Sequence, residues 1–291
     1  MTVTRVAVLG AGTMGHGIAH AAAAGGFETW LYDISREMLG KAQRSFEGIV
    51  EKGVALGKVD RAAATAILRR LHATTSLAEA TADVDLIIEA APERIDVKIA
   101  LLGEATALAP ARAVIATNTS ALSITEIAGS LADPSRVAGM HFFNPVHKMK
   151  LVEIVQALES SPAALEAIED VARRMGKETV LVRESPGFIT SRVNAMIGNE
   201  AFYMLQEGVA SARDIDRALK LGLNHPMGPF ELVDLVGLDT RLSVLEFLHK
   251  SLGEKYRPCP LLVQYVKAGR LGKKVGRGVY EYQHEEHSRR A

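Results

Sequence analysis

The sequence lacks the features that mark several classes of protein. Its single cysteine, Cys259, lies between two prolines, so the chain can form no internal disulfide and offers no second thiol for a zinc site. Basic and acidic residues number 34 each, and this balance gives no overall field that would favour nucleic acid. We therefore expect Cys259 to be a packed or loop thiol, and we expect no metal site and no nucleic-acid partner.

Long hydrophobic runs are also missing. No apolar stretch approaches the ~18–20 residues that a helix needs to cross a bilayer. The N-terminus has no basic segment followed by a short apolar one, and instead enters an apolar run at Val6–Leu9. We expect a cytoplasmic protein with no membrane partner, and an organelle matrix stays open only if a transit segment has been removed.

What the first half of the chain does contain is an alternation of short apolar runs with longer amphipathic stretches. The runs are rich in Val, Ile and Leu and are bounded by Gly, Asp, Asn or Pro, which is typical of parallel strands buried on both faces. Strands that alternate with helices predict an α/β fold, a Rossmann-type doubly wound parallel sheet. The expected strands are Arg5–Leu9, Thr29–Tyr32, Asp85–Ile88, Ala113–Ala116, Val137–Met140, Leu151–Val155 and Thr179–Val182.

The pattern changes after Ser185-Pro186-Gly187. A long helical pattern runs over Phe188–Leu205, and further helical patterns follow without strand alternation until Gly278-Val279-Tyr280. The sequence therefore predicts two domains. Residues 1–185 form a dinucleotide-binding Rossmann domain, and residues 186–291 form an all-α domain.

A glycine-rich loop lies between the first expected strand and the first expected helix. In Gly10-Ala11-Gly12-Thr13-Met14-Gly15, the first glycine permits a tight turn, the second lets the backbone approach a pyrophosphate, and the third lets helix and strand pack closely. The N-terminus of the helix adds free N–H groups and the positive end of its dipole. The motif alone is weak evidence, but here it has the required strand before it and helix after it. We predict that Gly10, Gly12, Thr13, Met14 and Gly15 bind the phosphates of a dinucleotide.

Asp33 indicates which dinucleotide is bound. It lies eighteen residues after Gly15 and directly follows the expected strand Thr29–Tyr32. A carboxylate there can bind both ribose hydroxyls of NAD and repels the extra phosphate of NADP. We predict NAD as the cofactor, and the nearby Arg36 leaves a small opening for NADP.

Polar residues follow two further strands. Ser120 closes the segment Asn118-Thr119-Ser120, and His141 and Asn144 lie at the end of another strand, in His141-Phe142-Phe143-Asn144-Pro145. Ligands of open α/β sheets gather at the carboxyl ends of strands, so we expect these side chains near one cleft. Histidine is well suited to exchange a proton near neutral pH, and Glu153 could hold one imidazole nitrogen. One histidine and one glutamate are not diagnostic by themselves.

Taken with their order and spacing, these motifs resemble the 3-hydroxyacyl-CoA dehydrogenase family, and most of all its short bacterial 3-hydroxybutyryl-CoA dehydrogenases. The resemblance covers nearly the whole chain. It rests on Gly10–Gly15, Glu89–Glu93, Asn118–Ser120, His141–Pro145, Pro186–Ile189, Asn224–Pro229, Lys255–Pro258 and Gly272–Gly278.

The resemblance implies roles for individual residues. His141 matches the family's catalytic histidine, Glu153 its carboxylate partner, and Ser120 the serine that touches the substrate's oxygen and the cofactor. Four residues match cofactor contacts and two match contacts to the coenzyme A part: Glu93, Lys98, Asn144 and Lys274, and then Ser45 and Lys52. The resemblance further implies NAD, an acyl-CoA substrate, a place in fatty-acid β-oxidation, and a homodimer formed by the helical domain, which closes over the cleft.

One position departs from the family pattern. The family usually has asparagine in the motif Gly-Phe-Ile-Val-Asn-Arg, where this chain has Ser191 in Gly187-Phe188-Ile189-Thr190-Ser191-Arg192. That asparagine helps to polarise the substrate's reacting oxygen in the family, so we include Ser191 among the catalytic residues. Two alternatives stay open: a dehydrogenase of the same fold that acts on free hydroxy acids, and an NAD-binding protein with impaired catalysis.

Overall fold

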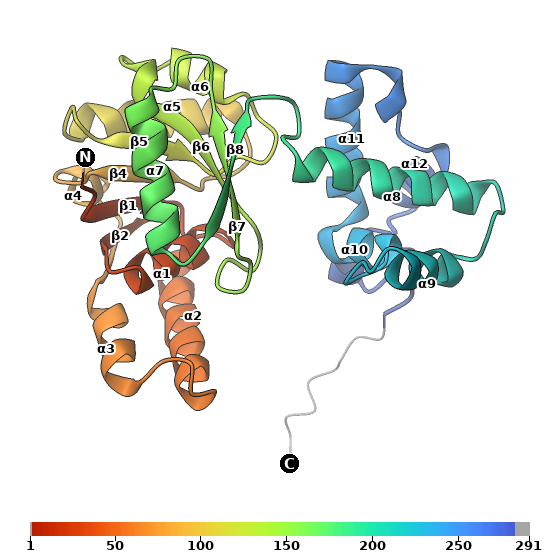
Figure 1. Ribbon diagram of the computed structural model, residues 1–291, viewed down its shortest axis with the longest axis horizontal. Coiled ribbons are helices and arrows are strands. Elements are labelled where there is room, and N and C mark those ends of the chain that lie inside the picture. Colours follow the sequence, from red (N-terminus) through yellow and green to blue (C-terminus); the bar gives the residue numbers. More distant parts are fainter. Residues whose placement is uncertain (1, 283–291) are drawn as a thin grey trace. The chain divides into compact units, whose positions relative to one another are not determined.

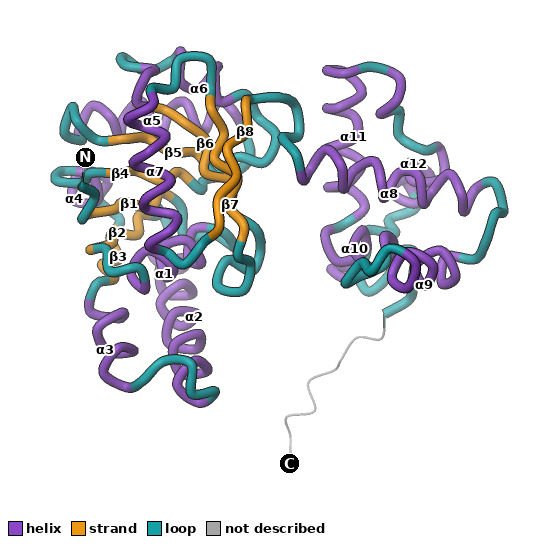
Figure 2. The backbone as a smooth tube through the Cα atoms, viewed as in Figure 1, coloured by secondary structure: helices purple, strands orange, loops and turns teal. Residues whose placement is uncertain are grey.

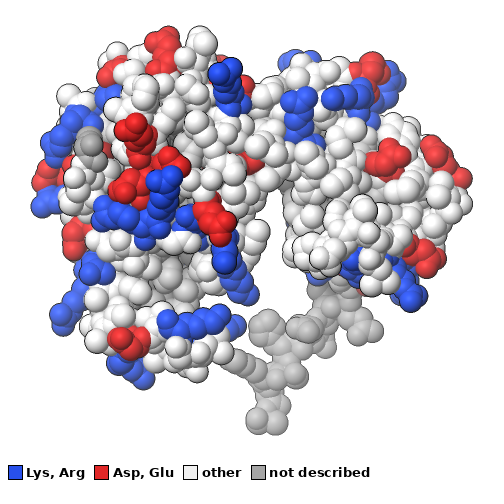
Figure 3. Space-filling model, in the orientation of Figure 1, with Lys and Arg blue, Asp and Glu red and all other residues white. Residues whose placement is uncertain are grey.

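The computed structural model describes residues 2–282, which fold into two compact units that divide between Glu184 and Ser185. Each unit is described by itself. On the face drawn in Figure 3, basic and acidic side chains are interspersed, in keeping with the zero net charge of the chain. Within residues 2–282, no helix is both long enough and apolar enough to cross a membrane.

The first unit is built on one eight-stranded sheet with helices on both faces (Figure 1). The strand order is β3-β2-β1-β4-β5-β6-β7-β8, and every neighbouring pair is parallel except β6 and β7. The strands are β1 (Arg5–Leu9), β2 (Glu28–Tyr32), β3 (Leu71–Thr74), β4 (Leu86–Glu89), β5 (Val114–Thr117), β6 (Val137–Phe142), β7 (Leu151–Gln156) and β8 (Glu178–Arg183).

The helices of this unit begin where the sequence supplies caps. The side chains of Ser35, Asp60, Ser76, Ser123 and Ser161 each accept a backbone N–H in the first turn of a helix. The α-helices are α1 (Gly15–Ala24), α2 (Arg36–Ala55), α3 (Arg61–Arg69), α4 (Leu77–Thr81), α5 (Ile95–Leu108), α6 (Ile124–Gly129) and α7 (Pro162–Arg174), with a short 3₁₀ helix at Pro134–Arg136.

The central strands carry the core. Every residue of β4, β5 and β6 is buried, because helices cover both faces of the sheet. The α/β architecture expected from the sequence is confirmed, with two differences. The sequence analysis missed β3, an edge strand that is largely exposed and therefore carries no continuous apolar signal. β7 runs antiparallel to β6 because only a short connection joins them, whereas a parallel return needs a longer crossover.

The second unit is helical, as expected (Figure 2). Phe202 and Phe230 meet edge to face in its core, 5.2 Å apart between ring centres, and Cys259 is buried in the same cluster. Residues 278–280 form no strand; Arg277 makes only isolated β-bridges. The helices are α8 (Thr190–Gln206), α9 (Ala212–Gly222), α10 (Pro229–Val236), α11 (Leu238–Leu252) and α12 (Pro260–Lys267), with 3₁₀ turns at Glu254–Tyr256 and Lys273–Val275.

Candidate active site

The glycine loop has the geometry that a dinucleotide needs. Gly10 has φ +108°, and a Cβ there would lie 2.7 Å from the Ala90 carbonyl oxygen at the end of β4. A Cβ on Gly15 would lie 1.7 Å from the Gly10 carbonyl oxygen, so helix α1 can approach the loop only with glycine at this position. A Cβ on Gly12 would meet nothing within 4 Å. The outer two glycines are therefore required by packing, whereas Gly12 borders open space where phosphate oxygens could approach the backbone.

Asp33 supports this loop directly. Its carboxylate accepts the Ala11 N–H at 2.8 Å and the Ser35 N–H at 2.8 Å, so one side chain joins the glycine loop to the start of α2. Its own N–H donates to the Thr74 carbonyl at the end of β3. A hollow of about 410 Å³ lies beside this point, lined by Arg36, Leu39, Gly40, Gln43, Ala73, Thr74 and Thr75.

His141 and Glu153 form a buried pair. They lie directly opposite each other in the antiparallel ladder of β6 and β7, and His141 Nδ1 lies 2.7 Å from Glu153 Oε2. Both side chains are buried, and the Phe143 ring packs on the imidazole with ring centres 4.6 Å apart. Because Nδ1 is engaged by the carboxylate, proton exchange with a substrate would use Nε2.

Ser120 is held by Glu93. One oxygen of Glu93, Oε1, accepts the Thr119 hydroxyl at 2.6 Å, the Ser120 N–H at 2.8 Å and the Ser120 hydroxyl at 3.2 Å. The other oxygen, Oε2, pairs with Lys98 Nζ at 3.2 Å. Burial alone would raise the pKa of the Glu93 carboxyl, but Lys98, the Thr119 hydroxyl and the Ser120 N–H outweigh it and hold that pKa below its usual range.

Ser120 lies just beyond β5, and His141 is the next-to-last residue of the neighbouring parallel strand β6. Asn118 ties the two strand ends together, since its side-chain oxygen accepts the Phe142 N–H at 2.9 Å. Asn144 is exposed just beyond β6. The first unit therefore gathers the predicted residues Gly10, Asp33, Glu93, Ser120 and His141 at the carboxyl edge of one sheet.

The remaining predicted residues lie elsewhere. Ser45 and Lys52 are seven residues apart on α2, and two turns of helix put them on one face. Lys274 and Ser191 belong to the second unit, where Lys274 Nζ pairs with both oxygens of Asp239 at 2.6 Å. Ser191 lies in the first turn of α8.

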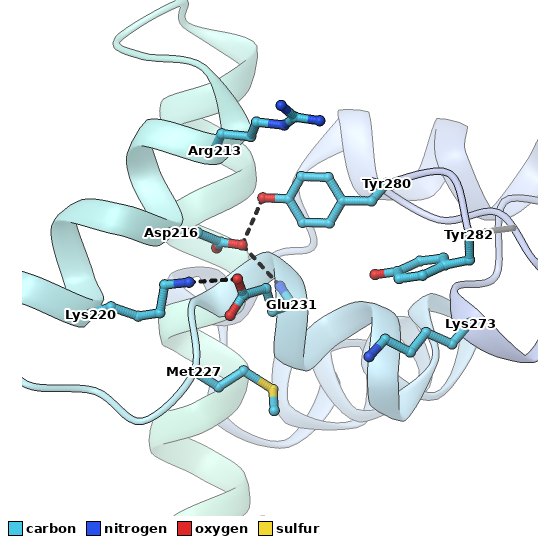
Figure 4. A pocket seen from close by; sticks show the side chains of 8 residues that line it. All are labelled: Arg213, Asp216, Lys220, Met227, Glu231, Lys273, Tyr280 and Tyr282. Atoms are coloured by element: carbon cyan, nitrogen blue, oxygen red, sulfur yellow. Dashed lines mark hydrogen bonds and ion pairs between the residues drawn. The ribbon is translucent and has the colours of Figure 1, made fainter.

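The second unit has a pocket of its own, of about 510 Å³, which contains none of the predicted residues. Figure 4 shows the Tyr280 hydroxyl and the Glu231 N–H directed at the Asp216 carboxylate, and Lys220 directed at Glu231. Burial raises the pKa of Asp216 although these donors favour its charged form. The contacts fasten the segment around Tyr280 to α9 and α10.

The sequence motifs do not assign a role to Asn118, Thr119 or Glu89, whose contacts only the structure shows. Glu89 gives one signal, since it is the only charged residue in the otherwise apolar strand β4.

The loop geometry yields a test. Gly12→Ala should fold normally, because the new methyl meets no protein atom, and should weaken NADH binding, because the methyl occupies the space of the phosphates. Fluorescence titration with NADH measures the second effect and thermal unfolding the first. Gly103→Ala is the matched control, since its methyl also enters open space but lies on α5 away from the loop. Unchanged NADH affinity in Gly12→Ala would contradict this assignment of the loop.

Comparison with known proteins agrees with this geometry. Residues 5–185 match the 3-hydroxyacyl-CoA dehydrogenase NAD binding domain, and residues 187–282 match the 3-hydroxyacyl-CoA dehydrogenase C-terminal domain. The chain is 43% identical over 281 residues to a 3-hydroxybutyryl-CoA dehydrogenase of Bradyrhizobium diazoefficiens, covering 96% of each chain. It is 43% identical to a probable 3-hydroxybutyryl-CoA dehydrogenase of Bacillus subtilis, covering 97% of this chain and 99% of that protein.

A solved structure gives the same result for the fold. The crystal structure of the (S)-3-hydroxybutyryl-CoA dehydrogenase from Ralstonia eutropha superposes with a TM-score of 0.94 at 40% identity, covering 97% of this chain and 100% of that one. Both halves of the chain match the two family domains in order, and they do so over nearly its full length. The chain belongs to the 3-hydroxyacyl-CoA dehydrogenase family.

Proposed function

We propose that this protein is an NAD-dependent dehydrogenase that interconverts (3S)-3-hydroxyacyl-CoA and 3-oxoacyl-CoA, with short chains such as 3-hydroxybutyryl-CoA preferred. The observation that carries the proposal is the buried His141–Glu153 pair at the same sheet edge as a dinucleotide-binding loop. The relatives named as 3-hydroxybutyryl-CoA dehydrogenases, at 43% identity over most of the chain, support the substrate.

The loop residues fit the cofactor, because Gly12 borders open space while Gly10 and Gly15 allow the tight turn and the approach of helix α1. Thr13 and Met14 would contribute to the phosphate site, and Asp33 would hold the ribose. Bound NAD supplies the hydride acceptor. A carboxylate at Asp33 disfavours the added phosphate of NADP, so NAD is the preferred cofactor.

The residues of the chain perform the proton chemistry. In oxidation, His141 Nε2 accepts the proton of the substrate's 3-hydroxyl group as a hydride leaves carbon 3, which bears that hydroxyl. Glu153 stabilises the resulting imidazolium through Nδ1, 2.7 Å away. Ser120, held by Glu93, donates to or accepts from the reacting oxygen and orients it. In the reverse direction, His141 returns the proton to the carbonyl oxygen.

The other predicted residues bind the larger ligand parts. Lys274 and Asn144 contact the cofactor, and Ser45 and Lys52, on one face of α2, bind the coenzyme A part. Ser191 takes the place of the asparagine that polarises the oxygen in the family, with a shorter side chain and a single proton to donate. The reaction belongs to fatty-acid β-oxidation in the cytoplasm.

A homodimer formed by the helical unit completes the proposal. Its apolar side chains include Leu221, which is 75% exposed, Leu223 at 66% and Val209 at 64%. Val193 is also exposed, and Ile197 and Leu232 are half-buried. So much exposed apolar surface on one small helical unit supports burial against a second copy of the chain.

The assigned substrate is tested by comparing two substrates. The unmodified protein should reduce NAD with (3S)-3-hydroxybutyryl-CoA and should show little turnover with free 3-hydroxybutyrate, because the free acid lacks the part that Ser45 and Lys52 bind. Absorbance of NADH measures both rates. Higher turnover of the free acid would favour a hydroxy-acid dehydrogenase of the same fold, and turnover of neither would favour an NAD-binding protein with impaired catalysis.

The proton-transfer role is tested on the buried pair. His141→Ala should lose ~10²–10⁴-fold in turnover and still bind NADH, since acid–base groups contribute about that factor. Glu153→Gln should also lose turnover, because a neutral amide stabilises the imidazolium less. His72→Ala is the control: His72 lies at the exposed edge strand β3, where it pairs with Glu28. An active His141→Ala variant would refute the mechanism.

The dimer is tested by introducing charge on the exposed apolar side chains. We expect the unmodified protein to sediment as a dimer at micromolar concentration, and the double variant Leu221→Glu, Leu223→Glu to sediment as a monomer. Leu158→Glu is the control, because Leu158 is 81% exposed but lies in the first unit. A monomeric unmodified protein would contradict the proposed assembly.

A further inference from the structure

A carboxylate that the proposed mechanism does not use is buried at the carboxyl end of a central strand. Glu89 ends β4, between β1 and β5, and its side chain is 0% exposed. The three residues before it in β4 are Leu86, Ile87 and Ile88. Burying a charged carboxylate is costly unless it is paired and hydrogen-bonded, so this position calls for an explanation beyond packing.

Glu89 is fully engaged by donors from three elements. Oε1 accepts the Ala91 N–H at 2.6 Å, Oε2 accepts the Thr117 hydroxyl at 2.6 Å, and Lys98 Nζ lies 2.8 Å from Oε1 and 3.0 Å from Oε2. Thr117 ends β5, Lys98 lies on α5, and Ala91 lies in the loop between β4 and α5. One carboxylate therefore joins two strand ends to a helix.

Lys98 carries the connection onward. Its side chain is 1% exposed, and its ammonium group contacts both oxygens of Glu89, the Ala91 carbonyl at 3.2 Å and Glu93 Oε2 at 3.2 Å. An ammonium group has three protons, and these acceptors account for all of them. Lys98 therefore reaches Ser120 through Glu93.

Glu93 is the link to the reacting oxygen. Lys98 holds its Oε2, while Oε1 receives the Thr119 hydroxyl and both the N–H and hydroxyl of Ser120. The side chain of Glu93 is 41% exposed, so packing alone does not fix its position. The buried Lys98 holds Oε2 and thereby determines where Oε1 lies. The contacts form one chain in the order Glu89, Lys98, Glu93, Ser120.

We propose that Glu89 is a positioning residue of the active site, which fixes Lys98 and thereby orients Glu93 and the Ser120 hydroxyl toward the reacting oxygen. The proposal rests on the proposed function, because it gives Ser120 its role there. A buried ion pair is weak evidence for stability, since apolar residues of similar size often serve as well. The role of the Glu89–Lys98 pair is geometric. It fixes the position of the Lys98 ammonium group, which in turn holds the half-exposed carboxylate of Glu93.

The Glu89→Gln substitution shows how the connection would fail. Lys98 contacts both oxygens of Glu89, so whichever oxygen the amide nitrogen replaces, it presents a donor to the ammonium group and one Lys98 contact is lost. The Thr117 hydroxyl can instead reverse its role and accept from the amide. Lys98 then has Glu93 as its only charged partner, moves toward it, and draws it from Ser120. Small misplacements of a reacting group cost up to ~10²-fold in rate, so we expect turnover to fall by ~10–10²-fold.

Three variants separate positioning from general stability. Glu89→Gln removes the charge. Glu89→Asp keeps the charge but draws the carboxylate back by one methylene, so it displaces Lys98 with less risk to folding. Asp85→Asn is the matched control. Asp85 is a buried carboxylate just before the opposite end of the same strand, where it accepts the N–H groups of Thr4 and Arg5. The Asp85→Asn substitution should lower the unfolding temperature without lowering turnover.

The decisive measurement places each variant in the Ser120→Ala background. If Glu89 acts through Ser120, Glu89→Gln and Glu89→Asp lower turnover in the unmodified protein and have little further effect once Ser120 is replaced. Equal losses in both backgrounds, or losses matched by Asp85→Asn, would overturn the proposal. If Glu89→Gln does not fold, the Glu89→Asp cycle decides alone.

A structural readout keeps this test separate from the proposed function. In the crystal structure of Glu89→Gln, or of Glu89→Asp if the former does not fold, the contact from Ser120 N to Glu93 Oε1, now 2.8 Å, should lengthen beyond hydrogen-bond range. An unmoved Glu93 refutes the positioning role whatever the enzyme's activity. A displaced Glu93 in a protein that never oxidises the thioester supports the connection and refutes only the proposed function.

Discussion

The site depends on charge buried at one edge of an apolar sheet. Glu89 and Glu153 are both 0% exposed, and each is paired with a cation or an imidazole that is itself buried. Such pairs add little to stability compared with apolar replacements, because desolvation offsets most of the attraction. The pairs do determine the orientation of the side chains, because each carboxylate oxygen is hydrogen-bonded by specific donors in fixed positions. The hydrophobic strands supply the stability that allows these charges to be buried in chosen positions.

The reversal of chain direction at β7 has a direct chemical consequence. An antiparallel neighbour places Glu153 directly opposite His141, so the carboxylate and the imidazole meet within one ladder step, 2.7 Å apart. The pair therefore comes from two adjacent strands joined by a short connection. Strands hold side chains more rigidly than loops do, so the imidazole is oriented before any substrate arrives. Ser120, the other polar residue at the proposed reaction centre, lies beyond the end of β5. A loop residue is held less rigidly, and here the carboxylate of Glu93 fixes it.

Much of this could be read from the sequence because the signals are local. The glycine loop, the apolar runs and the strand-end position of His141 each depend on a few consecutive residues. The edge strand β3 could not be predicted, since its exposed Leu71–Thr74 segment lacks an apolar pattern. Nor could the antiparallel direction of β7, which depends on pairing across the sheet. Glu89 was missed because a buried carboxylate has meaning only with its partners, and Lys98 and Thr117 are 9 and 28 residues away.

The end of β4 serves both halves of the chemistry. On one side, the Ala90 carbonyl lies so close to Gly10 that only glycine fits, which sets the position of the cofactor loop. On the other, Glu89 holds Lys98, and Lys98 holds the carboxylate that contacts Ser120. Glu89 and Ala90 are consecutive residues. The same rigid strand end therefore positions both the cofactor loop and the serine that orients the substrate. Hydride transfer requires the two ligands in a defined mutual position, and a shared strand end provides it.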